Sequence, residues 1–136
     1  MKNYYDLEGY KQSKALAISV HKLTLGLPKF NLYEEGSQIR RSSKSVTAMI
    51  VEGYGRRRYK AEFIRYLIFA QSECDETIIH LDFFFETQSL TNGDLYTQLH
   101  TDYNLLSKRI NKFIRWVEEN FKVQTGHLQP ETGNNK

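Results

Sequence analysis

The chain has 136 residues, enough for one domain, and its 40% hydrophobic and 26% charged residues are typical of a globular protein. A single cysteine excludes an intrachain disulfide, and no segment has the roughly 18 consecutive apolar residues of a membrane span. The first residues lack the apolar run of a secretory signal, so we expect a cytoplasmic protein without a membrane partner.

The net charge of +3 is unevenly distributed along the chain. The segment from Arg40 to Arg65 holds eight basic residues and only two acidic ones, Glu52 and Glu62. This segment therefore carries +6, and the rest of the chain carries −3. A local positive field says more about binding partners than the total charge does.

Apolar residues spaced three and four apart predict a first helix over about residues 7–25. Its stripe consists of Leu16, Val20, Leu23 and Leu27, with Ala17 and Ile18 beside it. Pro28 ends this helix, because proline has no backbone donor and disfavours a helical conformation in the residue before it.

A second helix is predicted over about residues 33–52, with an inward stripe dominated by small residues. The stripe consists of Ile39, Ser43, Val46, Ile50 and Gly53. Small side chains on this stripe allow a neighbouring helix to approach closely. Gly53 and Gly55 stand at the end of the periodic pattern and predict a left-handed cap that ends the helix.

Two longer helices are predicted over about residues 59–88 and 94–121, separated by a Thr91-Asn92-Gly93 turn. The inward seam of the first consists of Phe63, Leu67, Ala70, Cys74, Thr77, Leu81 and Phe84. The inward residues of the second are Leu99, Leu106, Ile110, Phe113 and Val117. Short loops force neighbouring helices to run antiparallel, which predicts an all-α, up-down-up-down four-helix bundle over residues 1–122. We expect a polar, disordered tail over residues 123–136.

The third predicted helix carries more large apolar residues than one inward face needs. The surplus consists of Ile64, Tyr66, Ile68, Phe69, Ile79, Phe83 and Phe85. Because burial of each large side chain is worth roughly 1.5–3 kcal/mol, this surplus favours a homo-oligomer, with a wider monomer core as the alternative.

The sequence lacks the common catalytic and metal-binding motifs, so it gives no support for an enzyme. The sequence contains no phosphate-binding loop, no Gly-x-Ser-x-Gly elbow, no His-Glu-x-x-His and no Cys-x-x-Cys. Di-iron bundles use Glu-x-x-His pairs, whereas Glu76 and His80 are separated by three residues and have no second pair. We therefore expect no enzymatic activity, no metal and no cofactor, and a solvated or interfacial edge at these residues.

The basic segment is the candidate nucleic-acid-binding surface. Its members are Arg40, Arg41, Lys44, Arg56, Arg57, Arg58, Lys60 and Arg65. Tyr54 and Tyr59 stand among these cations, where aromatic rings can stack on bases. An ordinary solvated face with Arg–Glu pairs is the alternative.

An ordered set of residues between Ser37 and Glu76 points to a known family. It comprises Gln38, Arg40, Arg41, Ser45, Glu52, Gly53 and Arg56, then Glu62, Phe63, Leu67, Ala70, Ser72 and Glu76. With Leu27-Pro28 before it, the set resembles the four helix bundle proteins of the 23S rRNA intervening-sequence type. Their pattern reads Gln-x-Arg-Arg-Ala-x-x-Ser-Ile-Pro-x-Asn-Ile-Ala-Glu-Gly-x-x-Arg, and the similarity spans about residues 7–121.

The resemblance implies a ring-like homopentamer without enzymatic activity, encoded within an intervening sequence of a large-subunit rRNA gene. A related branch, the accessory variability determinant (Avd), assists the reverse transcriptase of diversity-generating retroelements, with nucleic acid as a proposed ligand. This chain has Thr47 and Met49 where the family has proline and asparagine. Glu52 matches the family, and we expect it to pair with Arg41 or Arg56.

Two functional hypotheses follow from the sequence. One is an accessory scaffold that binds RNA or DNA, and a reverse transcriptase with it, through the basic surface. The other is a purely structural homo-oligomer whose partners are proteins.

Overall fold

The computed structural model describes residue 4 and residues 7–121 of the chain. These residues form five α-helices and no strand. The helices are α1 (Glu8–Leu25), α2 (Lys29–Tyr33), α3 (Glu35–Gly55), α4 (Lys60–Glu86) and α5 (Gly93–Asn120). The tail predicted over residues 123–136 lies outside the described residues.

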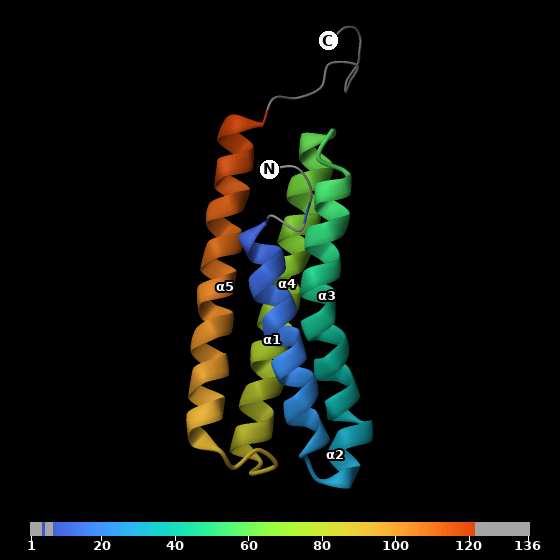
Figure 1. Ribbon diagram of the computed structural model, residues 1–136, viewed down its shortest axis with the longest axis vertical. Helices are drawn as coiled ribbons and strands as arrows, with labels where there is room; N and C mark the ends of the chain where they lie inside the picture. Colours follow the sequence, from blue (N-terminus) through green and yellow to red (C-terminus); the bar gives the residue numbers. More distant parts are fainter. Residues whose placement is uncertain (1–3, 5–6, 122–136) are drawn as a thin grey trace, which may run out of the picture.

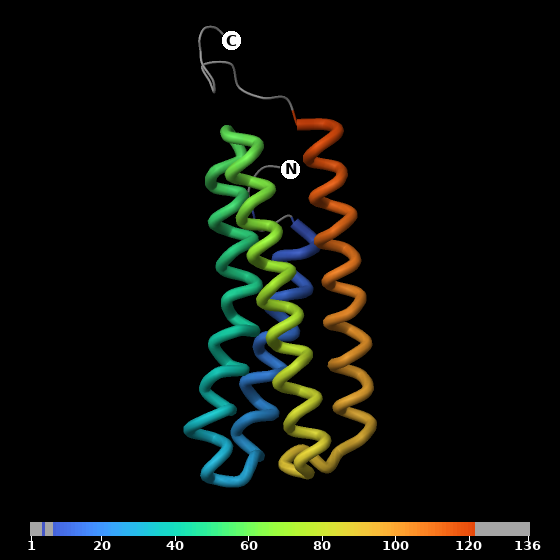
Figure 2. The backbone as a smooth tube through the Cα atoms, turned by 180° about the vertical axis from the view of Figure 1, so that it is seen from behind, coloured from blue at the N-terminus to red at the C-terminus, as the bar shows by residue number. Residues whose placement is uncertain are grey.

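The four long helices run up and down beside one another, as Figure 1 shows. α3 packs against α1 and α4, α4 packs against α5, and α5 closes the bundle against α1. The same order is seen from behind in Figure 2, where the α3–α4 connection lies at the end of the molecule at which α5 finishes. The predicted all-α bundle is therefore confirmed, with the short α2 as an additional helix at the opposite end.

The core follows the predicted stripes of α3 and α4 closely. All seven seam residues of α4 and all five stripe residues of α3 are buried. On α1, Leu23 of the predicted stripe is only half-buried, and Ile18, which was placed beside the stripe, is 47% exposed. On α5 the core takes Tyr103 and Ile114, while Phe113 is half-buried at its edge.

The glycines near the end of α3 are not a left-handed cap. α3 remains helical through Gly55, and its capping residue Arg56 has a φ of −104°. Gly53 lies inside the helix against α4, where an added Cβ would be 3.1 Å from Cβ of Tyr66 and 3.3 Å from the backbone O of Phe63. The prediction of the cap was wrong because this glycine serves close helix packing.

Several of the surplus apolar residues of α4 are exposed on the isolated chain. Ile68, Ile79 and Phe83 are 47%, 53% and 52% exposed, and Phe69 and Phe85 are also exposed. Ile64 and Tyr66 are half-buried. None of the described helices is both long enough and apolar enough to cross a membrane.

Candidate nucleic-acid interface

The structure divides the predicted basic surface into two groups. Arg40, Arg41 and Lys44 lie along α3, whereas the remaining five cations lie at the α3–α4 connection and the start of α4. We call these five the hairpin cluster: Arg56, Arg57, Arg58, Lys60 and Arg65. Sixteen helical positions separate Arg40 from Arg56, about 24 Å along the axis. The eight residues therefore do not form one patch.

Arg40 is engaged within the bundle. One of its guanidinium nitrogens donates to Oγ1 of Thr24 at 2.9 Å, and the other donates to the backbone O of Leu32, also at 2.9 Å. These bonds join α3 to α1 and α2. Because partly buried, charge-assisted hydrogen bonds stabilise a fold, Arg40 holds the helices together.

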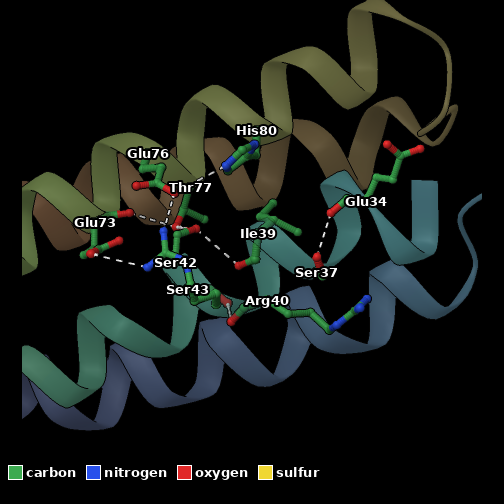
Figure 3. Close-up of polar contacts among 11 residues, drawn as sticks. Glu34, Ser37, Ile39, Arg40, Ser42, Ser43, Glu73, Glu76, Thr77 and His80 are labelled. Carbon is green, nitrogen blue, oxygen red and sulfur yellow. Dashed lines mark hydrogen bonds and ion pairs between the residues drawn. The ribbon is translucent and has the colours of Figure 1, made fainter. Parts of the chain in front are cut away.

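Arg41 faces acidic residues of α4. Its Nη2 lies 2.6 Å from Oε2 of Glu76, and its Nη1 lies 3.8 Å from Oε2 of Glu73. Figure 3 shows Glu73, Glu76 and His80 on α4, above the part of α3 that carries Ser42. Burial raises the pKa of Glu73, and the nearby Arg41 charge partly offsets that rise. Two carboxylates thus neutralise the field of Arg41.

The remaining acidic and histidine residues near Arg41 do not form a metal centre. His80 is only 12% exposed in its side chain and lies 3.5 Å from Oε2 of Glu76, so it is largely covered rather than on a solvated edge. In the part of the chain that the structure describes, no three His, Cys, Asp or Glu side chains are grouped to hold a metal ion.

The hairpin cluster combines paired and unpaired cations. Arg56 lies 2.6 Å from Oε2 of Glu52, and its guanidinium also covers the ring of Tyr66 at 4.7 Å. The pairing of Glu52 is thus with Arg56 and not with Arg41. Arg58 is exposed and makes no hydrogen bond or ion pair with any described residue. The five cations and the two acids Glu52 and Glu62 together carry +3, and Lys60 also donates to the backbone O of Glu118 at the end of α5.

The two tyrosines of the predicted surface differ in access to solvent. Tyr54 is only 6% exposed, and its ring is covered by the Arg57 guanidinium at 4.0 Å. The expectation that it stacks on a base was wrong, because its ring packs edge-on against Phe63 in the core. Tyr59 is 54% exposed and lies directly beside the arginines. One aromatic ring therefore remains available for stacking.

A second basic surface, which the sequence did not reveal, is formed by α1 together with α3. His21 of α1 belongs to this surface, and its Nδ1 lies 3.2 Å from Nζ of Lys44 on α3. Lys14 and Lys22 lie on the same face of α1, since they are two helical turns apart. The spacing of Lys14 and Lys22 in the sequence indicated that they share one face of α1. Nothing in the sequence showed that this face lies beside α3.

The similarity to known proteins agrees with this fold. The model of the 23S rRNA-intervening sequence protein family matches residues 5–112. The chain belongs to this family. One matching solved structure is the crystal structure of a protein with unknown function from the S23 ribosomal protein family, from Bacteroides thetaiotaomicron, with a TM-score of 0.69 and 24% identity. The match covers 79% of this chain and 98% of that protein. No curated protein matches at a significant level.

Proposed function

We propose that this family member is a non-enzymatic scaffold that assembles with copies of itself and binds RNA or DNA through the hairpin cluster. The observation that carries the proposal is the concentration of five cations in the hairpin cluster, with Arg58 exposed and unpaired among the described residues. Tyr59 adds an exposed ring beside these cations. Cations with an adjacent aromatic ring are the usual means of holding a nucleic-acid backbone and stacking a base.

The ion pairs of Arg56 and Arg65 leave these two cations available to phosphate. Arg56 and Arg65 pair with Glu52 and Glu62, but all four side chains are at least 42% exposed. Exposed pairs of this kind are worth only about 0–1 kcal/mol. A phosphate group can therefore replace the carboxylate at little cost.

Self-association strengthens the proposal. A homopentamer, as the family resemblance implies, would repeat the hairpin cluster on each subunit. Repeated weak sites raise the overall affinity without any new contact in each subunit. The proposal extends to a role beside the reverse transcriptase of a diversity-generating retroelement, for which a reverse-transcriptase gene next to this one is the expected genomic sign. Neighbouring rRNA genes would instead favour the intervening-sequence branch.

The test is binding of RNA and of DNA across a salt series. We expect the logarithm of the affinity to fall linearly with the logarithm of salt, with a slope of about −0.9 per phosphate on duplex DNA and about −0.7 on single strands. Arg56→Glu/Arg57→Glu/Arg58→Glu should abolish binding while the assembly stays intact. Lys11→Glu/Lys29→Glu/Lys108→Glu is the matched control, because it changes three exposed cations elsewhere and should bind like the wild type.

Failure of the wild type to bind at low salt would contradict the proposal, as would an unchanged salt slope in the triple arginine variant. The second candidate, a structural oligomer with protein partners, would then be favoured by the exposed apolar residues of α4. Metal analysis tests the non-enzymatic part of the proposal, since stoichiometric iron or manganese in the purified protein would contradict it.

A further inference from the structure

A groove of about 560 Å³ runs along the outer side of the bundle, between α1 and α3. Its floor is mostly apolar and is formed by Ala17, Ile18 and Ala48 together with Thr47, whose hydroxyl donates to Oγ of Ser13. Lys14, Lys22 and Lys44 lie along it together with His21, and none of the described residues that line it is acidic. The groove therefore fits an occupant that is apolar in its centre and negatively charged at its edges.

Two of the charges and one apolar residue of the groove form a single row on α1. Lys14, Ile18 and Lys22 are successive members of an i, i+4, i+8 series, so they form a line of one cation, one apolar side chain and one cation. Ile18 is 47% exposed, and Lys22 has no hydrogen bond or ion pair with a described residue. Lys14 lies against Tyr10, with its Nζ 3.4 Å from the tyrosine hydroxyl, so Ile18 and Lys22 are the members of the row that face solvent without such a contact.

The outer face of α4 carries the opposite pattern. Residues 66–86 contain five acidic side chains and no lysine or arginine. Asp75, Ile79 and Phe83 form an i, i+4, i+8 row that ends at Glu86, and we call these four residues the α4 ridge. Ile79 and Phe83 are half exposed, and neither Asp75 nor Glu86 pairs with a described residue.

The two rows are also similar in length. Lys14 and Lys22 are about 12 Å apart along α1, and Asp75 and Glu86 are about 16 Å apart along α4, at 1.5 Å per residue. Flexible lysine side chains can span the difference. A ridge laid along the groove would set Ile79 and Phe83 over Ile18 and place an acid beside a lysine at each end.

We propose that the α4 ridge of one copy of this chain docks into the α1–α3 groove of the next copy. The proposal rests on the self-association proposed above and names the surfaces that form it. Because one chain carries both complementary surfaces, we expect a second copy of the chain to occupy the groove. The groove lies between α1 and α3, whereas the ridge lies on α4, so the contact joins two different surfaces and is head-to-tail (Figure 1). A contact of this type forms a ring when the rotation between copies closes.

Charge reversal on each surface tests this contact. The groove variant is Lys14→Glu/Lys22→Glu, and the ridge variant is Asp75→Lys/Glu86→Lys. Each replaces attraction by repulsion at two positions, so each should raise the dissociation midpoint of the assembly by about tenfold or more. Light scattering on a sizing column measures the mass, and circular dichroism confirms that the helices are retained. Lys29→Glu/Lys108→Glu carries the same charge change as the groove variant outside both surfaces and should assemble like the wild type.

The variant that combines all four substitutions in one chain is the decisive test of the contact. Its acidic groove again faces a basic ridge, so assembly should return to the wild-type midpoint within about threefold. A groove or ridge variant that keeps the wild-type midpoint overturns the proposed contact, and so does a combined chain that stays folded and monomeric. A wild-type chain that is itself monomeric contradicts the self-association in the proposed function. The nucleic-acid binding in that proposal is tested by the separate binding measurement.

Discussion

Gly53 and Gly55 are two residues apart on α3, yet their surroundings differ. A Cβ on Gly53 would lie 3.1 Å from Cβ of Tyr66, 3.3 Å from the backbone O of Phe63 and 3.4 Å from the ring of Phe63. A Cβ on Gly55 would meet nothing within 4 Å. Both residues are helical, so alanine has the same intrinsic advantage at each position.

We expect opposite effects of alanine at these two glycines. Gly55→Ala should raise the free energy of unfolding by about 0.5–1 kcal/mol, because it restricts the unfolded chain without a clash. Gly53→Ala should lower it by about 1 kcal/mol or more, because the atoms it meets belong to stiff parts of α4. Thermal and urea unfolding measure both changes. Equal stabilisation by the two substitutions would show that α4 yields easily at this contact.

Cys74 is buried in the seam of α4, and burial raises its thiol pKa from 9.0 to about 12. The thiol should therefore resist alkylation at pH 8 in the native protein and react rapidly only in denaturant. Rapid labelling of the native chain would contradict this burial.

The same pKa predicts an alkaline loss of stability. From about pH 9 to pH 12 the unfolded chain loses the Cys74 proton and the native chain keeps it, so stability falls as the pH rises. The slope for one such group is at most about 1.4 kcal/mol per pH unit. Cys74→Ala should flatten the fall between pH 9 and pH 11, whatever its effect at neutral pH. An unchanged slope in urea titrations of this variant would exclude Cys74 as a source of the effect.

At the scale of helices, the short α2 and the start of α3 are held by polar bonds to distant segments. Arg40 joins α3 to Thr24 and to Leu32. Asn31 of α2 donates to Glu35 at 3.2 Å and accepts from Oγ of Ser89, in the α4–α5 turn, at 2.6 Å. These bonds replace the apolar packing that a five-residue helix cannot supply.

Arg40→Ala should lower the free energy of unfolding by about 1.5–3 kcal/mol, because it leaves Thr24 and Leu32 without a charged donor. Arg58→Ala is the matched control and should leave stability unchanged within about 0.5 kcal/mol, because this side chain is exposed and unpaired among the described residues. Equal losses in the two variants, measured by urea unfolding, would contradict a structural role of Arg40.

At the scale of the whole molecule, the proposed nucleic-acid contact and the proposed contact between copies should respond differently to salt. Binding through phosphates should fall by several orders of magnitude between 50 mM and 200 mM salt if six or more phosphates are neutralised. The contact between copies includes apolar side chains, whose burial salt does not weaken, so the assembly should persist over the same range. Light scattering and binding measured in one salt series test both. Parallel loss of mass and binding would contradict two separate surfaces.

The sequence alone predicted the α-helical bundle and the buried seam of α4, because each helix carries its own three-and-four spacing of apolar residues. On α5 that spacing allowed either Phe113 or Ile114 to face inward, since both lie one turn from Ile110. Packing decided for Ile114, and Phe113 lies at the edge of the core with its ring 5.7 Å from that of Phe63.

Only the tertiary structure decided which basic residues remain on the surface and which hold the bundle together. Arg40 bonds to Thr24, sixteen residues earlier, and Arg41 pairs with Glu76, thirty-five residues later. Local spacing does not reveal such partners, because they depend on which helices become neighbours. For the same reason, the match between the α1–α3 groove and the α4 ridge became visible only once the helices were placed around the bundle.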